Sequence, residues 1–144
     1  MWASNLAGLP RAYFRLEKLM EQHCPAVLRH ILKDLTISII APQYFLTLFL
    51  YNLVWPCCLR VFDYFLLDGP SVIYSTALAL FQIHNDKILS LSFEELITFV
   101  KFSHQIDHQL LAKKIHLFIS IVKKELPKLD TLYDKYNKNK PKNK

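Results

Sequence analysis

A long uncharged stretch in the middle of the sequence constrains the fold more than any other feature. No residue between Leu35 and Leu59 carries a charge, and a stretch of that length can cross a bilayer. Pro42 and Pro56 interrupt it, and the roughly dozen residues between them are more typical of a core helix than of a membrane span. We therefore expect a soluble, all-α, multi-helix bundle, and keep a small membrane protein that spans near residues 35–67 as the less favoured alternative.

The residues that follow the uncharged stretch also favour the bundle. Arg60 and Asp63 would each cost roughly 2.5–3.5 kcal/mol to insert into a bilayer. A helix that is hydrophobic on all sides also occurs at the centre of a bundle, where neighbouring helices cover it. The segments 43–52 and 57–67 lack a polar face, so we expect these two helices to be the most buried in the chain.

Hydrophobic residues recur at helical spacing along nearly the whole chain. The sequence has only two glycines, which argues against hairpin turns and against the phosphate-binding loops of common nucleotide-binding enzymes. Pro25, Pro42 and Pro56 are expected to open helices, because proline fits best in the first turn of a helix. The expected helices cover residues 11–23, 25–35, 43–52, 57–67, 71–84, 107–126 and 128–136, with a further one after Ser92.

Three local signals mark the ends of these helices. Ser92 and Glu95 have the spacing of a capping box. Gly69 stands where a helix commonly ends in a residue of positive φ, and Pro70 follows it as a stop. Pro127 is expected to end or kink the long helix before it, because proline has no amide hydrogen to donate.

The net charge of +6 comes mostly from the C-terminal end of the chain. Residues 135–144 hold five lysines and no acidic residue, so the rest is nearly neutral and no nucleic acid is expected to bind the folded part. We expect a helical domain over residues 1–134 and a disordered, Lys/Asn-rich tail over residues 135–144. The tail is interpreted as a solvated extension, or as a weak electrostatic tether to anionic lipid or nucleic acid.

The cysteines and histidines give little sign of chemistry. The three cysteines fit no disulfide framework, which suggests a reducing compartment, and Cys57 and Cys58 are expected to be separate buried thiols. His104, Asp107 and His108 are a candidate metal site, because histidines four apart on a helix can share a metal. We favour surface polar residues there, and we expect no metal, no cofactor and an interior role for His30.

Several spaced segments point to a known family. They are "PAVLRHI", "YFLTLF", "RVFD", "LLDG", "ALALF" and "SFEEL", in this order. Over roughly residues 2–103, this succession resembles the C-terminal half of TBC domains, the Rab GTPase-activating fold. Tyr44 and Phe62 stand where that family usually has tryptophan. The resemblance implies that Arg60, Asp63 and Gly69 are structural signature residues. The spacing of Arg60 and Asp63 also predicts neighbouring, partly buried side chains.

The resemblance also implies a mechanism whose catalytic residues we do not find. TBC domains supply an Arg finger from an IxxDxxR motif and a Gln finger from a YxQ motif, both in their N-terminal half. No Asp in this chain has Arg three residues later, and no Tyr has Gln two residues later. We therefore expect no catalytic residue, and we do not expect the chain to be an enzyme itself.

The leading hypothesis is part of a Rab GTPase-activating protein that regulates vesicle trafficking, in the cytoplasm and peripheral to endomembranes. Its expected partners are a Rab-type small GTPase and the missing N-terminal half of the domain, with peripheral membrane association through the basic tail. Met1 is then an internal residue of a longer protein, or else the start of a short product. The alternative function is a non-catalytic helical module that binds a GTPase or another protein.

Overall fold

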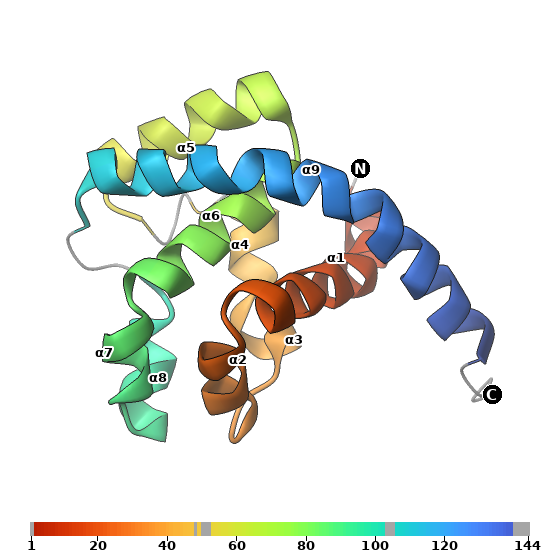
Figure 1. The fold of residues 1–144 in the computed structure, drawn as a ribbon, viewed down its shortest axis with the longest axis horizontal. Coiled ribbons are helices and arrows are strands. Elements are labelled where there is room, and N and C mark those ends of the chain that lie inside the picture. The colour runs from red at the N-terminus through yellow and green to blue at the C-terminus, as the bar shows by residue number, and fades with distance from the viewer. Residues whose placement is uncertain (1, 48, 50–52, 103–105, 140–144) are drawn as a thin grey trace.

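The computed structural model describes residues 2–47, 49, 53–102 and 106–139. These residues form nine α-helices and no strand, which confirms the all-α fold class. The helices are α1 (Trp2–His23), α2 (Pro25–Leu32), α3 (Ile37–Ile40), α4 (Pro42–Thr47), α5 (Trp55–Asp68), α6 (Ser71–Ile83), α7 (Asn85–Leu89), α8 (Phe93–Phe99) and α9 (His108–Asn139). Figure 1 shows α5 and α9 side by side along one edge of the molecule, with α6 next to them.

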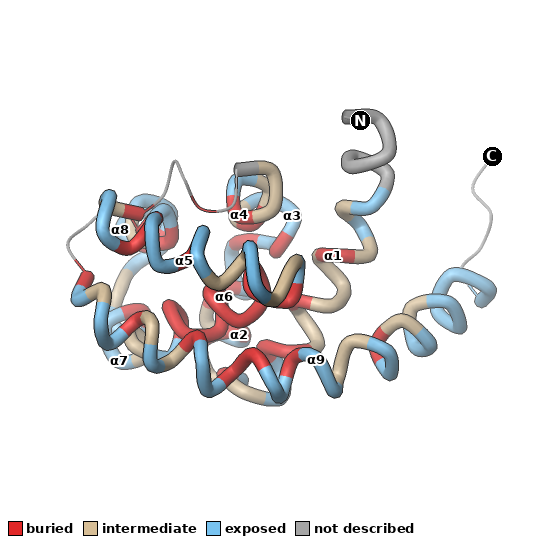
Figure 2. The backbone as a smooth tube through the Cα atoms, turned by 90° about the horizontal axis from the view of Figure 1, so that it is seen from above, coloured by how far each residue is buried: buried red, intermediate tan, exposed pale blue. Residues whose placement is uncertain are grey.

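Helix α6 is the centre of the fold. It contacts α9, α5, α1, α4 and α7, and every residue from Ser71 to Phe81 is buried (Figure 2). Its buried hydroxyl groups stay within the helix: Ser75 donates to the Ser71 carbonyl at 2.9 Å and Thr76 to the Val72 carbonyl at 2.7 Å. The helix is therefore surrounded by neighbours without leaving these polar groups unpaired.

The prediction that segment 57–67 is among the most buried in the chain is wrong. In α5 the buried residues are Cys57, Cys58 and Val61, and most of the others are at least partly exposed. The segment 43–52 lies partly outside the described residues. Lack of a polar face does not determine burial, because α6 packs against α1, α4, α5, α7 and α9, whereas the main helix contacts of α5 are with α6 and α9.

The region of the long uncharged stretch differs in detail from the prediction. Helix α4 ends at Thr47, and Phe49 has a φ of +64°, a left-handed conformation that cannot continue a helix. Residues 48 and 50–52 lie outside the description. No helix in the described ranges combines the length and apolar character that a membrane span requires.

The two expected C-terminal helices are a single helix, α9, with Pro127 inside it. Figure 1 shows that α9 changes direction along its length, so the proline kinks the helix and does not end it. Residues 135–139, which we expected to belong to the disordered tail, continue α9. Helical propagation from a well-packed segment extends the structure into this polar sequence. Residues 140–144 lie outside the described part.

The local signals at the helix ends are confirmed. Gly69 has a φ of +73°, and Pro25 is the first residue of α2. Ser92 and Glu95 form a complete capping box at the start of α8, in which the Ser92 amide donates to Glu95 Oε2 at 3.2 Å. These features depend on a few consecutive residues, which is why the sequence predicts them well.

Candidate functional site

The candidate site is the corner where α5 ends, α6 begins and α9 passes beside both. The Gly69 amide donates to the Phe65 carbonyl at 2.9 Å, and the Ser71 hydroxyl donates to the Asp68 carbonyl at 3.0 Å. Glycine suits the turn because residues with a side chain rarely adopt its positive φ. The turn sends the chain directly from partly exposed α5 into buried α6.

Polar contacts tie α5 to α9 along their shared length. Side-chain hydrogen bonds between described residues join them: Arg60 Nε to His108 Nδ1 (3.4 Å), Tyr64 Oη to the Ala112 carbonyl (3.4 Å) and Lys123 Nζ to Asp68 Oδ1 (2.6 Å). Residue numbers rise in the same direction on both helices, so α5 and α9 run parallel (Figure 1). Lys123 and Asp68 also form a salt bridge that fixes the end of α5 beside α9.

The structure places Arg60 and Asp63 differently from the prediction. Both side chains are exposed, so the expectation of a partly buried pair is wrong. The Arg60 guanidinium donates to His108, and no ion pair in the described part of the chain joins it to Asp63. The reason is the orientation of α5, because the side that bears these two residues faces away from α6.

An apolar stripe covers the exposed side of α5. Its members have the following exposed fractions: Trp55 69%, Leu59 44%, Phe62 42%, Leu66 67% and Leu67 82%. Four of them recur at spacings of four, three and four residues, which places them on one side of the helix. Exposed apolar groups that are contiguous commonly mark an interaction surface. We call these five residues the α5 apolar stripe.

An ion cluster between α1 and α9 was missed by the sequence reasoning. Arg15 Nε donates to Asp130 Oδ1 at 2.7 Å, and Arg11 donates to Asp130 at 3.3 Å and to Asp134 at 3.1 Å. Arg15 also donates to the Tyr74 hydroxyl at 3.3 Å; burial raises the pKa of Tyr74, and this bond opposes the rise. The only available signal was the spacing of four residues within each charged pair. Both arginines are engaged in holding α1 against α9.

The cysteines are buried and point to different partners, as predicted. The Cys57 thiol donates to the Ile106 carbonyl at 3.5 Å and the Cys58 thiol to the Leu53 carbonyl at 3.0 Å. Burial raises the pKa of both thiols, and it raises the pKa of Cys24 to about 12. These thiols are poor nucleophiles at neutral pH, because the thiolate is the reactive form.

The histidines considered earlier have structural partners. His30 Nε2 donates to the Leu91 carbonyl at 3.0 Å, which confirms a satisfied, half-buried histidine. Asp107 accepts from the Gln109 amide at 2.9 Å at the start of α9, and His108 contacts Arg60. His104 lies outside the described residues. Within those residues, no three metal-ligating side chains form a group.

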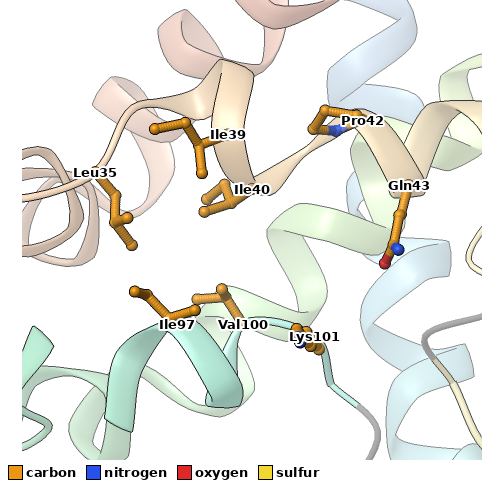
Figure 3. Close-up of a pocket in the computed structure, with 8 residues that line it drawn as sticks. All are labelled: Leu35, Ile39, Ile40, Pro42, Gln43, Ile97, Val100 and Lys101. Atoms are coloured by element: carbon orange, nitrogen blue, oxygen red, sulfur yellow. The ribbon is translucent and has the colours of Figure 1, made fainter. Parts of the chain in front are cut away.

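A groove lies between α3 and α4 on one side and α8 on the other (Figure 3). It has a volume of about 220 Å³ and is lined by Leu35, Ile39, Ile40, Pro42, Gln43, Ile97, Val100 and Lys101. Figure 3 shows Leu35, Ile39 and Ile40 opposite Ile97 and Val100, with the polar side chains toward one end. The walls suit apolar side chains of a partner and provide no nucleophile.

Comparisons with known proteins agree with this helical architecture. The family model of the Rab-GTPase-TBC domain matches residues 1–89, more than half of the chain. The chain therefore belongs to the Rab-GTPase-TBC domain family.

The individual relatives share 26–28% of aligned residues with this chain and are much longer than it. The GTPase-activating protein GYP5 of Saccharomyces cerevisiae is 26% identical over 70% of this chain and 11% of its own length. The GTPase activating protein Gyp51 of Schizosaccharomyces pombe is 28% identical over 70% of this chain and 10% of its own length. The human ecotropic viral integration site 5 protein homolog is 26% identical over 76% of this chain and 13% of its own length. The chain thus spans about a tenth of the length of these relatives.

Proposed function

We propose that this chain forms part of a Rab GTPase-activating protein and builds the TBC domain without supplying a catalytic finger. The family match over residues 1–89 carries this proposal, supported by relatives named as GTPase-activating proteins. In this proposal residues 1–134 are the C-terminal half of the domain. The chain acts as a regulator in vesicle trafficking and is not an enzyme itself.

The absence of both finger motifs from the sequence supports a non-catalytic role for this half. Arg11 and Arg15 are bound to carboxylates in the ion cluster, so neither is available to approach a phosphate. Arg29 and Arg60 are exposed, and they are the first arginines to test if the chain proves active. A finger residue can contribute several powers of ten to the rate, so its loss is readily measured.

Two partners follow from the proposal: a GTP-loaded Rab protein and the N-terminal half of a TBC domain. The groove beside α4 is an apolar surface suited to the second partner, because Ile39 and Ile97 are exposed there. The protein would then work in the cytoplasm at the surface of endomembranes. The basic C-terminal residues would add electrostatic attraction to such surfaces.

The test uses a chimera that joins residues 1–134 to the N-terminal half of the GYP5 TBC domain. Under this proposal, the GYP5 half supplies both finger motifs. Phosphate release from a panel of GTP-loaded Rab proteins is then measured for the chimera and for each half alone. We expect acceleration by the chimera only. A matched chimera with Leu78→Asp, which places a charge in the fully buried α6, should be inactive.

A folded chimera that binds Rab without accelerating hydrolysis would favour the alternative of a non-catalytic interaction module. Circular dichroism of the chimera separates this outcome from simple misfolding. A folded chimera that neither binds Rab nor accelerates hydrolysis would contradict the proposal.

A further inference from the structure

A second pocket lies where α1 packs against α3 and α9. It has a volume of about 400 Å³, and four of the residues that line it are aromatic: Tyr13 and Phe14 from α1, and Tyr133 and Tyr136 from α9. Among the described residues that line it, Glu17 is the only charged one. We call it the aromatic pocket, and it is separate from the groove beside α4.

The aromatic rings of this pocket are held in place by one another. The Phe14 ring lies edge-on to Tyr133, with 5.3 Å between the ring centroids, and is stacked on Tyr136 at 5.7 Å. The two tyrosines are three residues apart on α9 and therefore share one side of that helix. The rings thus form a wall that exists before any ligand binds.

Cations already contact these rings at the edge of the pocket. The Arg11 guanidinium carbon lies 4.7 Å from the centroid of the Tyr133 ring, and Lys18 Nζ lies 5.6 Å from the centroid of the Phe14 ring. The face of an aromatic ring attracts cations because its π electrons are negatively polarised. Each of these two cations is also paired with a carboxylate, so their charges are balanced within the chain.

Glu17 differs from the other charged groups at this place. Its side chain is half-buried, and no ion pair or hydrogen bond joins its carboxylate to another residue in the described part of the chain. Lys135 and Lys138 are exposed on α9 and do not line the pocket. A carboxylate that is partly removed from water is stabilised by a cation that donates hydrogen bonds to it. The pocket therefore combines an unpaired negative charge with rings that attract cations.

We propose that the aromatic pocket binds the guanidinium group of an arginine side chain in a basic segment of a partner protein. A guanidinium group is planar, stacks on aromatic faces and donates two hydrogen bonds to one carboxylate, so it can use the rings and Glu17 together. The hydroxyl groups of Thr36 and Ser38 also line the pocket and can accept further N–H groups. A trimethylammonium group has no N–H and would use none of these acceptors. A lysine ammonium is more strongly hydrated and does not stack as a plane.

Peptide binding to the isotope-labelled, full-length chain, followed by nuclear magnetic resonance, tests this proposal. The probe is a short peptide of glycine and serine with blocked ends and a single central arginine. Matched peptides carry lysine or citrulline, the neutral analogue of arginine, at the same position. We expect the arginine peptide to shift the amide resonances of α1 and α9 around the pocket, and to bind at least about threefold more tightly than the lysine peptide. The citrulline peptide should cause no shift, and added salt should weaken arginine binding.

Substitutions in the pocket should weaken binding of the arginine peptide. Glu17→Gln keeps the shape of the side chain and removes its charge, and should lower the affinity by about fivefold. Tyr136→Leu removes one ring and should lower it by about threefold. The matched controls are Glu94→Gln and Phe93→Leu on α8, where both residues are exposed and lie outside the pocket. These should leave the affinity unchanged, and circular dichroism should show equal helix content in all four variants.

The proposal is overturned if the arginine peptide does not bind, or if the citrulline peptide binds equally well, because the pocket would then not select a cation. Tighter binding of the lysine peptide would contradict a guanidinium site. Binding that both pocket substitutions leave unchanged would place the arginine elsewhere on the surface. Binding that occurs only after residues 140–144 are removed would show that lysines of this chain occupy the pocket, which also contradicts the proposal. None of these measurements involves a Rab protein, so their failure is distinct from failure of the proposed function.

Discussion

Helices α5 and α6 follow one another, are joined by Gly69 and Pro70, and are both rich in apolar residues, yet their burial is opposite. All residues from Ser71 to Phe81 are buried, whereas α5 exposes the five residues of its apolar stripe. The difference arises from their neighbours, since α6 is surrounded and α5 is covered on one side. An apolar helix therefore has to be covered, but its sequence does not say whether this chain or a partner covers it.

The largest expected effect tests this contrast with matched leucines. Leu78 in α6 is fully buried and Leu66 in α5 is 67% exposed. Leu78→Ala should lower the free energy of unfolding by about 2–5 kcal/mol, from lost transfer energy and a cavity. Leu66→Ala should change it by less than about 0.5 kcal/mol. Denaturant unfolding of both variants provides the measurement, and equal losses would show that the outer side of α5 is covered in solution.

The turn between the two helices gives the next effect. Gly69→Ala should cost about 1–2 kcal/mol, because an L residue is strained at a φ of +73°. Apart from Gly69 itself and the two adjacent residues, no described heavy atom lies within 4 Å of the added methyl group, so the cost reflects backbone strain. Gly8→Ala is the control: it lies inside α1 and should stabilise by up to about 1 kcal/mol. A neutral Gly69→Ala in thermal unfolding would argue against the positive φ at this turn.

A smaller effect tests the attachment of α5 to α9. Asp68→Asn and Lys123→Gln remove the salt bridge one side at a time, and the double variant completes a mutant cycle. We expect a coupling energy of about 0.2–1 kcal/mol, because the pair is partly exposed to solvent. The coupling should shrink in high salt. Zero coupling at low salt would mean that other contacts hold the end of α5 in place.

The last prediction concerns Cys57 and Cys58 on the inner side of α5, whose raised pKa values should have the smallest effect on stability at neutral pH. Burial raises the pKa of Cys57 and of Cys58, so both thiols should resist alkylation at about pH 8, whereas Leu66→Cys adds one fast-reacting thiol on the outer side. A raised pKa in the folded state favours the protonated thiol. Its contribution to stability is complete below the usual thiol pKa of about 8.5 and is lost as pH rises through the raised value. Rapid labelling of the native thiols at about pH 8 would contradict this burial.

Features set by a few neighbouring residues were predicted correctly from the sequence. The all-α class, the capping box at Ser92 and the positive φ of Gly69 depend on local pattern and turn chemistry. The separate environments of Cys57 and Cys58 follow from helix geometry alone. In each case the physical cause lies within about one helical turn.

Features set by tertiary packing were not predicted from the sequence. The exposed position of Arg60 and Asp63, and the greater burial of α6, depend on which helices come to lie beside α5. The ion cluster joins Arg15 to Asp130 across more than a hundred residues of sequence, and no local pattern pairs them. Pro127 shows the same limit in part, because the sequence predicts that it ends or kinks the helix, and the structure shows which: α9 continues through it with a kink.

The central claim is that this TBC-family chain helps to build a Rab GTPase-activating domain but holds no finger of its own. Its most direct test is phosphate release from a panel of GTP-loaded Rab proteins in the presence of the chain alone. We expect the intrinsic hydrolysis rate of each Rab to be unchanged. Stimulation above about tenfold that is abolished by Arg60→Ala or Arg29→Ala would contradict the claim, because an arginine of this chain would then serve as the finger.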